Sequence, residues 1–479
     1  MSKLTKQTTD FSKWYLELID LAELADYTAT KGAMVIKPYG YRIWELMKEN
    51  LDKRIKQKGV ENTAFPTLIP ESFITKEAEH IEGFAPELLT ITKVGEKELD
   101  EPYVLRPTSE TIMYDTFSKW IESYRDLPLK INQWANIFRW EKRTRPFLRT
   151  SEFFWQEGHT VHETEQEADE MTIEALEMYD DFAKETMAMV GVKGRKTEAE
   201  KFAGAKYTTT IEMIARDGKA IQSCTSHQLG QGFAKSFGIK FVDKNEKMQT
   251  PWQTSWGLST RMLGAMIVCH GDDKGLRLPP KIAPYQVVII PIGKDDKIFD
   301  EAKKIDSELK NLGIRTKIDA RQKSPGFRIA EWEVKGAPIR IEMGMRDLEN
   351  NQLTLARRDT DEKFTIKIDE LSKISEILEE IHNGLLTQHE EFLAQNTREV
   401  FDYDTFKEII ENKNQEYGKV GGGFVKAGWC GNEECEEKIQ SETKASSRCI
   451  PFSDENRAPG DCVYCGKPAE KIVVFAKAY

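Results

Sequence analysis

The spacing of apolar and polar residues along the chain predicts helices and strands arranged in several blocks. Apolar residues at helical intervals between Phe11 and Leu21 predict an amphipathic helix near the start of the sequence. From residue 31 to about residue 283, helical stretches mix with short strands that are rich in aromatic residues. Prolines at positions 279, 280 and 284 then interrupt this pattern, which indicates a domain boundary.

The segment after these prolines has the pattern of a compact α/β domain of about 100 residues, a usual domain size. It predicts an amphipathic helix over 300–312 that ends at Gly313, and a second helical stretch over 372–395. Strands are predicted over 285–292, 315–318, 338–342, 352–356 and 364–368. A last region contains a turn of three glycines at 421–423 and most of the cysteines. We therefore expect three domains, 1–283, 284–386 and 387–479.

Composition narrows the class of protein. The 479 residues are 39% hydrophobic and 31% charged, with ten tryptophans and a net charge of −11. The charged fraction is too high for a membrane protein, and the aromatic content is too high for a disordered one. A net acidic chain argues against a general DNA-binding protein but does not exclude a local basic face. The start of the sequence lacks the apolar segment of a signal peptide, so we expect a cytoplasmic protein without a membrane or DNA partner.

Five of the seven cysteines lie in the last fifty residues. Cys430 and Cys435 form a C-x4-C pair, and Cys462 and Cys465 form a C-x2-C pair. Four thiolates at this spacing are typical of a structural Zn²⁺ site, and they leave no open position for catalysis. A redox pair and a coincidental cluster are the alternatives, although the βαβ context of a thioredoxin-like site is absent. Cys449 lies between the pairs and is not needed as a ligand.

The chain has no GxxxxGK[ST] phosphate-binding loop. A charged hairpin is instead the candidate nucleotide site. The segment Phe138-Arg139-Trp140-Glu141 is followed by a charged loop and then by a strand with Phe153 and Glu157. Alternation is expected to place Arg139 and Glu141 on one strand face, with Phe153 and Glu157 on the facing strand. Arg139 would hold an α-phosphate and Phe153 would stack on a purine. A surface hairpin with alternating charges is the alternative.

The pattern F-R-x-E, loop, R-x-x-x-F-x-x-x-E resembles motif 2 of the class II aminoacyl-tRNA synthetases. Residues 40–58 with Pro66 resemble motif 1, and residues 257–265 with Arg261 resemble motif 3, although Thr260 departs from the commoner glutamate. Further segments resemble the prolyl-tRNA synthetases of the archaeal/eukaryotic type, and the resemblance covers essentially the whole chain. These segments are 106–110, 146–150, 155–159, 201–204 and 224–227.

The resemblance implies a multidomain α/β protein. Its class II catalytic core would be an antiparallel sheet with helices, followed by an α/β anticodon-binding domain and a small zinc-binding α+β domain. It also implies that proline, ATP and tRNA(Pro) react to give prolyl-tRNA, AMP and pyrophosphate, with Mg²⁺ bridging the ATP phosphates. Because the attacking carboxylate and the α-phosphate are both anionic, the site must neutralise charge and align the two groups.

The same resemblance assigns residues to each substrate. Arg139 and Arg261 would be catalytic, one between carboxylate and α-phosphate and the other at the γ-phosphate. ATP contacts are expected from Arg139, Glu141, Arg149, Thr150, Phe153, Gln222, Thr225 and Arg261. Proline contacts are expected from Thr108, Glu110, Arg139, Trp155, His159, Phe202 and His227. Glu342 and Arg346 would contact anticodon bases, beside ten basic residues between positions 315 and 358.

Several expectations keep an explicit alternative. Without the resemblance, His159 and His227 would be ordinary hydrogen-bonded core histidines. Tyr479 matches a family ending in which the terminal carboxylate lies near the active site, and a mobile end is the alternative. The stretch from Gly158 to Trp252 is too short for the editing insertion of bacterial-type prolyl enzymes, so we expect no internal editing. Motif 1 implies a homodimer. A synthetase for another amino acid, such as threonine, and an inactive RNA-binding relative are the alternative functions.

Overall fold

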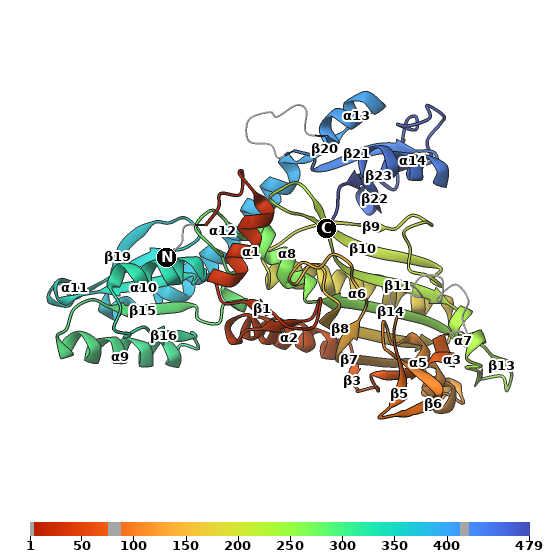
Figure 1. Ribbon diagram of the computed structural model, residues 1–479, viewed down its shortest axis with the longest axis horizontal. Helices are drawn as coiled ribbons and strands as arrows, with labels where there is room; N and C mark the ends of the chain where they lie inside the picture. The colour runs from red at the N-terminus through yellow and green to blue at the C-terminus, as the bar shows by residue number, and fades with distance from the viewer. Residues whose placement is uncertain (1–3, 75–87, 412–420) are drawn as a thin grey trace.

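The computed structural model describes residues 4–74, 88–411 and 421–479. An eleven-stranded sheet forms the centre of the described chain (Figure 1). Neighbouring strands are antiparallel except for the two pairs β20–β21 and β3–β7. In sheet order the strands are β20 (Thr397–Glu399), β21 (Phe424–Trp429), β23 (Lys471–Ala476), β22 (Ser446–Pro451), β9 (Val192–Arg195), β10 (Tyr207–Ile214), β11 (Ala220–Gly230), β14 (Trp252–Ser259), β8 (Glu152–His162), β7 (Leu129–Phe138) and β3 (Glu61–Asn62).

Helices cover one face of this sheet and bury a large apolar core against it. Helix α6 (Glu165–Glu185) begins at a capping box in which Thr164 and Glu167 each bond the other's backbone N–H. Its apolar residues recur at helical spacing and pack on β11 and β14, where Tyr179 meets the ring of Trp256 at 6.1 Å. Helix α8 (Arg261–His270) lies on the same strands. The other face of these strands is therefore left for a site.

The helix predicted from the first apolar pattern is present as α1 (Phe11–Leu21), and Asp10 caps it. The predicted motif 1 helix is α2 (Pro38–Gln57), which starts at a proline in the first helical position. Smaller elements surround the catalytic core. They are β1 (Ala25–Tyr27), β2 (Met34–Ile36), β4 (Leu68–Pro70), α3 (Glu71–Ile74), β5 (Leu89–Val94), β6 (Lys97–Leu105), α5 (Glu110–Trp120), η2 (Tyr124–Asp126), α7 (Gly232–Ser236), β12 (Phe241–Val242), β13 (Met248–Gln249) and η3 (Pro280–Ile282).

A second sheet of five strands forms a separate α/β unit, as the sequence predicts. Its order is β16-β15-β17-β18-β19, with the first three strands parallel and the last two antiparallel to their neighbours. Each predicted strand of this unit lies within two residues of its observed bounds. The elements are β15 (Val287–Pro291), α9 (Asp296–Asn311), β16 (Thr316–Ile318), α10 (Pro325–Val334), β17 (Ile339–Met343), α11 (Met345–Glu349), β18 (Gln352–Arg357), β19 (Lys363–Lys367), η4 (Ile368–Glu370) and α12 (Lys373–Gln395).

The five-stranded unit and the C-terminal region both contact the catalytic core. The buried guanidinium of Arg358, beyond β18, donates two hydrogen bonds to Asp272, which follows α8. Strand β22 of the C-terminal region pairs with β9, so that region extends the catalytic sheet. The remaining elements there are α13 (Tyr403–Ile410), α14 (Glu433–Thr443) and η5 (Phe452–Asp454). Helix α12 runs without a break through residue 386, where the sequence places a domain boundary.

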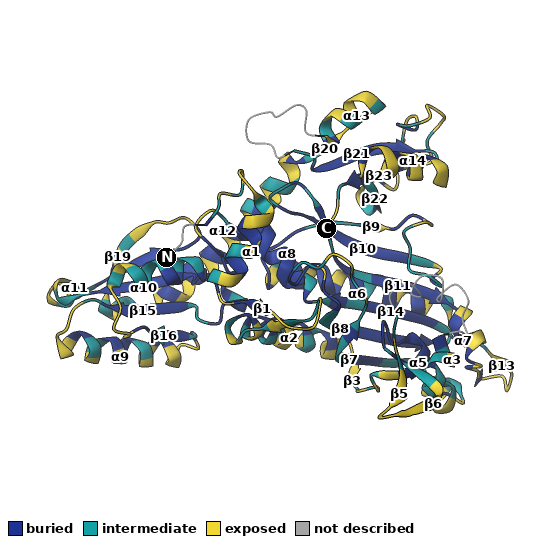
Figure 2. Cartoon of the chain, viewed as in Figure 1, coloured by how far each residue is buried: buried dark blue, intermediate teal, exposed yellow. Residues whose placement is uncertain are grey.

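Burial follows this architecture. Figure 2 shows the inner strands of both sheets as mostly buried, while the edge strands β3, β19 and β20 and the outer surfaces of α9 and α13 are more exposed. Among the described residues, no helix has the length and the apolar character required to cross a lipid bilayer.

Candidate active site

A cavity of about 250 Å³ lies on the open face of the central sheet. Alternation along β8 directs Phe153, Trp155, Glu157 and His159 into it, while the intervening residues face the helices. Strand β11 contributes through a bulge, because its register against β10 shifts by one residue at Ser223. The cavity is lined by Thr108, Glu110, Arg139, Phe153, Trp155, Glu157, His159, Lys196, Glu200, Phe202, Thr208, Gln222, Ser223, Cys224, Thr225, His227, Ser255, Trp256, Gly257, Leu258, Ser259 and Arg261.

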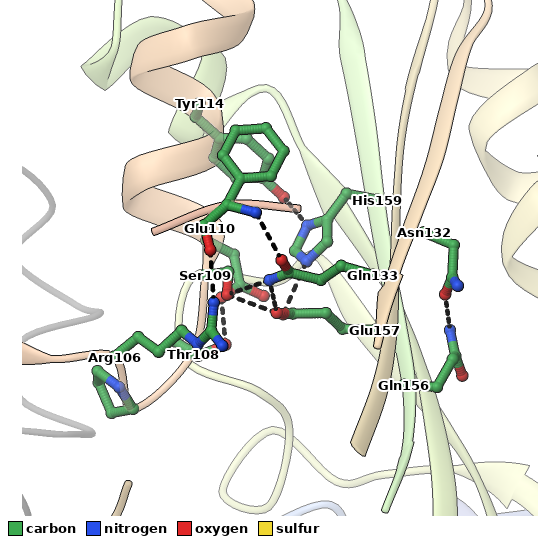
Figure 3. A network of polar contacts seen from close by, with 12 residues as sticks. Arg106, Thr108, Ser109, Glu110, Tyr114, Asn132, Gln133, Gln156, Glu157 and His159 are labelled. Atoms are coloured by element: carbon green, nitrogen blue, oxygen red, sulfur yellow. Dashed lines mark hydrogen bonds and ion pairs between the residues drawn. The ribbon is translucent and has the colours of Figure 1, made fainter. Parts of the chain in front are cut away.

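One part of the cavity is acidic. Glu110 is the first residue of α5 and is only 3% exposed, and the Thr108 hydroxyl donates a hydrogen bond to its Oε2. A carboxylate in this position gains from the partial positive charge of the helix N-terminus. Ser109 donates to Glu157 Oε1 at 2.5 Å and is itself bonded by Gln133, so a second buried carboxylate is fixed nearby (Figure 3). Two buried carboxylates favour a cationic ligand group.

The two cavity histidines differ in their pKa. His159 lies between the Tyr114 hydroxyl, 3.2 Å from Nδ1, and Glu157 Oε2, 3.1 Å from Nε2 (Figure 3). Burial lowers its pKa, but the hydrogen bond to Glu157 and the charges of Glu110 and Glu157 raise it more, so the net pKa is raised. His227 has only threonine hydroxyls as partners, and burial lowers its pKa to about 4. His227 is therefore neutral at pH 7.

Two arginines, Arg139 and Arg261, add a basic part to the cavity. Arg139 Nε donates to the Pro107 carbonyl at 2.9 Å, and its guanidinium lies 5.7 Å from the ring centres of both Phe153 and Trp155. Arg261 is the first residue of α8, and its Nε donates to the Leu148 carbonyl at 3.2 Å. Burial, together with Arg139 and Arg149, lowers the pKa of Arg261 to about 10, so it stays charged at neutral pH. This cluster suits a polyanion.

The structure therefore brings together most of the residues expected at the site. The expectation that Arg139 and Glu141 share one strand is wrong, because β7 ends at Phe138 and the hairpin opens into a loop. Glu141, Arg149 and Thr150 do not line the cavity. Arg149 is exposed and lies 3.8 Å from Glu141, while Thr150 is 8% exposed. Their expected contacts with ATP stay predictions.

Several cavity residues were not predicted from the sequence. They include Lys196, Glu200 and Ser255, for which the sequence carried no signal. Glu157 was expected beside Phe153 in the hairpin, but no substrate contact was assigned to it. Ser255 Oγ and Trp155 Nε1 are buried without a hydrogen-bond partner in the described chain, although both residues line the cavity. Because buried polar atoms are seldom left unpaired, these two atoms are candidates for ligand contacts.

Comparison with known proteins identifies the family. The chain matches the family described as tRNA synthetase class II core domain (G, H, P, S and T) over residues 92–270, and an anticodon binding domain over residues 286–378. Residues 403–479 match the family described as prolyl-tRNA synthetase, C-terminal. The chain is 49% identical to a proline--tRNA ligase of Natranaerobius thermophilus, with 100% of this chain and 98% of that protein covered. The chain belongs to the prolyl-tRNA synthetase family.

Other members of this family agree in sequence and in structure. Proline--tRNA ligase 2 of Clostridioides difficile is 48% identical, with 100% of this chain and 98% of that protein covered. A crystal structure of prolyl-tRNA synthetase from Cryptosporidium parvum, complexed with halofuginone and AMPPNP, has a TM-score of 0.93 and 42% identity. It covers 99% of both chains. The expected class II fold is confirmed.

The four cysteines of the two sequence pairs meet in space. The Sγ atoms of Cys430, Cys435, Cys462 and Cys465 all lie within 4.8 Å of one another. Cys430 Sγ is 3.7 Å from both Cys435 Sγ and Cys465 Sγ. Zn–S bonds of about 2.3 Å at tetrahedral angles would separate the sulfurs by about 3.8 Å, so the set fits Zn²⁺. Cys449 is fully buried on β22, and burial raises its pKa to about 12, so it is an inert thiol.

The family's anticodon-binding unit is less basic on its surface than the sequence suggests. Of the ten basic residues between 315 and 358, Arg328, Lys335, Arg340 and Arg358 are buried. Glu342 is 8% exposed and its Oε2 lies 2.7 Å from Lys363 Nζ, while Arg346 is exposed on α11. Several of these charges therefore hold the fold together rather than face a nucleic acid.

Tyr479 packs against the catalytic core, so its contacts do not favour the alternative of a mobile end. Its backbone N–H donates to the Ala220 carbonyl at 3.2 Å, and its hydroxyl donates to Asp217 Oδ2 at 2.7 Å. The guanidinium of Arg145, from the loop of the motif 2 hairpin, lies 5.2 Å from the centre of its ring. The end of the described chain thus lies beside the motif 2 loop.

Proposed function

We propose that the chain attaches L-proline to tRNA(Pro) in two steps and that the cavity over β8, β11 and β14 is the site of both. The observation that carries the proposal is the division of one cavity into an acidic part at Thr108 and Glu110 and a basic part at Arg139 and Arg261. A zwitterionic amino acid bound between them would direct its ammonium to the carboxylates and its carboxylate to the arginines. Family membership supports the same assignment.

The acidic part suits the secondary ammonium of proline. The Thr108 hydroxyl donates its hydrogen bond to Glu110. The lone pairs of the Thr108 oxygen therefore remain able to accept a hydrogen bond from an N–H of the ligand. Glu110 supplies the counter-charge. The rings of Trp155 and Phe202 and the neutral imidazole of His227 would enclose the apolar ring of proline. The ring centres of Phe202 and His227 are 4.6 Å apart. His159 would act through Glu157, to which it is bonded.

The basic part suits the first chemical step. A carboxylate oxygen of proline attacks the α-phosphorus of ATP, and the bond to the pyrophosphate oxygen breaks. Arg139 would lie between the two reacting anions and stabilise the charge that develops there. Arg261 would hold the γ-phosphate, while Phe153 would stack on adenine and Gln222 and Thr225 would complete the ATP contacts. ATP would enter as its magnesium complex, which disperses charge on the phosphates.

The second step transfers the prolyl group. The terminal 3′-hydroxyl of tRNA attacks the carbonyl carbon of the adenylate. The bond between that carbon and the phosphate oxygen breaks, and AMP leaves with this oxygen. No side chain in the cavity stands out as a general base for this hydroxyl, so we assign the proton to a phosphate oxygen of the adenylate. Glu342 and Arg346 are proposed to contact anticodon bases, although the burial of Glu342 makes Arg346 the stronger candidate.

We further propose the three-domain division at 283 and 386, structural Zn²⁺ on the four cysteines, a cytoplasmic location and a homodimer. The dimer is supported by exposed apolar side chains near motif 1. Tyr27, Val35 and Tyr41 are 63%, 51% and 40% exposed in β1, β2 and α2. Apolar side chains gathered on one region of the surface commonly mark an interface.

We also propose that the chain lacks an internal editing site. The segment between β8 and β14 consists of α6, three strands of the central sheet, α7 and the β12–β13 hairpin, which leaves no room for an inserted domain. A pocket fitted to proline discriminates against a smaller amino acid by only about 1–3 kcal/mol per methylene. Alanine charged in error would therefore stay on tRNA(Pro) unless another protein removed it. Efficient hydrolysis of Ala-tRNA(Pro) by the purified chain would contradict this.

One experiment tests the proposed function against its alternatives. ATP–pyrophosphate exchange would be measured with each amino acid in turn. We expect exchange with proline and only weak exchange with smaller residues. Exchange with threonine in preference to proline would assign another amino acid, and no exchange with any amino acid would indicate an inactive RNA-binding relative.

A further inference from the structure

The segment between β9 and β10, residues 196–206, forms one wall of the proposed active-site cavity. Lys196, Glu200 and Phe202 from this segment line the cavity. It has no helix or strand of its own in the described chain, and it is shaped by turns that start at its first residues. The carbonyl of Thr197 accepts hydrogen bonds from the backbone N–H groups of Glu200 and Lys201 at 3.2 and 3.0 Å. The placement of Lys196 and Thr197 therefore contributes to the position of the wall, whose other end is held by the Phe202 N–H bonded to Thr208 Oγ1 at 2.9 Å.

Thr197 is bonded to a residue of the C-terminal region. Its hydroxyl donates to Glu436 Oε1 at 2.8 Å, and the hydroxyl of Ser447 donates to the same oxygen. Thr197, Glu436 and Ser447 are all at most 6% exposed, so water does not compete for these bonds. Glu436 lies in the first turn of α14, which also carries Cys435.

Lys196 is bonded to the same region through a shared carboxylate. Lys196 Nζ lies 2.8 Å from Glu212 Oε1, and Arg448 Nε and Nη2 donate to Glu212 Oε2 at 3.0 and 2.9 Å. Burial raises the pKa of Glu212, but the charges of Lys196 and Arg448 lower it further, to about 2. The carboxylate is thus ionised between two buried cations.

The backbone explains how two consecutive residues of β22 reach the same region. Alternation would turn Ser447 and Arg448 to opposite faces, but the register against β23 shifts by one residue between Ser447 and Cys449. A bulge of this kind redirects a side chain. Strand β22 also approaches β9 closely at Gly194, where a Cβ atom would lie 2.3 Å from the Ile450 carbonyl oxygen.

We infer that Glu436 and Arg448 are positioning residues that fix the 196–206 wall and thereby set the affinity for the amino acid. This inference rests on the proposed function. Neither residue lines the cavity, so both act through Thr197 or through Glu212 and Lys196. The C-terminal domain would then be part of the amino-acid site, although its own fold lies outside the cavity.

The test compares Glu436→Ala with Glu436→Gln. The second oxygen of Glu436 has no hydrogen-bond partner in the described chain, so glutamine can keep the accepting Oε1 and lose only the charge. We expect Glu436→Ala to raise the KM for proline about tenfold in pyrophosphate exchange, since a buried bond is lost. The KM for ATP should change less than twofold, and Glu436→Gln should restore the wild-type KM for proline. Glu437→Ala, at the exposed neighbouring position, is the matched control.

Amide hydrogen exchange of residues 198–206 gives a readout that does not depend on activity. Exchange there should be faster in Glu436→Ala than in the wild type and unchanged in Glu436→Gln, at equal zinc content. If Glu436→Ala does not fold, Thr197→Val removes the same bond from the other side and should give the same two effects.

Unchanged proline KM and unchanged exchange in Glu436→Ala, or in Thr197→Val, would overturn the inference. Equal effects of Glu436→Ala and Glu436→Gln would also overturn it, because they would indicate that the charge and not the bond matters. A wild-type chain that does not activate proline would refute the proposed function instead, and the hydrogen-exchange comparison would still decide whether the bond fixes the wall.

Discussion

The pKa of an individual side chain in the cavity depends on the groups beside it. Burial is the main cause of the lowered pKa of Arg261, and the positive charge of Arg139 lowers it further. Two positive charges held close together repel one another, so binding of a polyanion between them would be favourable. The two histidines show the same dependence, because His159 has a carboxylate partner and His227 has only hydroxyl partners.

Replacing Arg139 with alanine should abolish proline-dependent ATP–pyrophosphate exchange. Removal of a preorganised group that stabilises developing charge costs about 100-fold or more in rate. The measurement is exchange at saturating proline and ATP. Arg125→Ala, an exposed arginine on η2, is the control and should keep full activity. Retained exchange in Arg139→Ala would refute the assigned role.

The raised pKa of His159 predicts a pH-dependent contribution to stability. A folded-state pKa above the unfolded value of about 6.5 means that the contribution is complete below that pH. It is then lost as the pH rises through the folded-state pKa. We expect the difference in unfolding free energy between the wild type and His159→Gln to shrink from pH 6 to pH 9. A difference that stays constant across this range would show that His159 does not titrate in this way.

At the scale of elements, successive side chains of β8 point alternately into the cavity and towards the helix-covered core. Phe153, Trp155, Glu157 and His159 face the cavity, and Gly158 lies opposite Trp256 beneath α6. A Cβ atom at Gly158 would lie 2.2 Å from the Trp256 ring, so the glycine allows the close approach. The sequence pattern predicted α9 from residue 300, but it starts at Asp296 because Asp295 caps it through a bond from the Lys297 N–H.

Gly158→Ala should therefore destabilise the protein by about 1–3 kcal/mol, the usual cost of overpacking a core. Denaturant unfolding monitored by tryptophan fluorescence measures this. Gly326→Ala, in the exposed first turn of α10 with no atom within 4 Å of the added Cβ, should cost nothing or stabilise slightly. Equal stability of the two variants would contradict the packing argument.

The four-cysteine cluster should hold about one zinc ion per chain, since four thiolates close the coordination sphere. Elemental analysis of the purified protein measures the content. Serine at Cys430, Cys435, Cys462 and Cys465 together should remove the metal, whereas Cys449→Ser should retain it. A metal-free wild-type protein that folds normally would favour the coincidental cluster.

At the scale of the whole molecule, one sheet runs from the C-terminal region through the catalytic core. Buried polar contacts join regions that are far apart in sequence, such as Arg358 with Asp272 and Arg448 with Glu212. A buried ion pair is costly to break because it leaves an unpaired charge behind. These contacts link the five-stranded unit and the C-terminal region to the catalytic core within the described chain.

The motif 1 surface predicts a homodimer. Static light scattering at micromolar concentration should give twice the 55.0 kDa mass of the chain. Tyr41→Lys would place a charge among the exposed apolar side chains and should shift the equilibrium towards the monomer. A monomeric wild-type protein under these conditions would refute the prediction.

The sequence by itself determined the local chemistry and much of the secondary structure. Hydrophobic periodicity determines which face of a helix or strand is buried, so α1 and the strands of the five-stranded sheet could be predicted within a few residues. The helix α2 was expected from the resemblance to motif 1. The alternation of the hairpin predicted Arg139 and Phe153 at one site, and cysteine spacing predicted the four-cysteine cluster. The resemblance to the synthetase motifs added Arg261 to the same site.

Only the tertiary structure decided what lies beside these residues. The loop of Glu141 and Arg149 leaves the strand ladder at Phe138, a boundary that alternation does not mark. The pairing of β22 with β9, the bond of Thr197 to Glu436 and the pairing of Arg448 with Glu212 join segments that have no local sequence signal in common. Periodicity gives the direction of a side chain, whereas its neighbour depends on which distant strand the chain brings alongside.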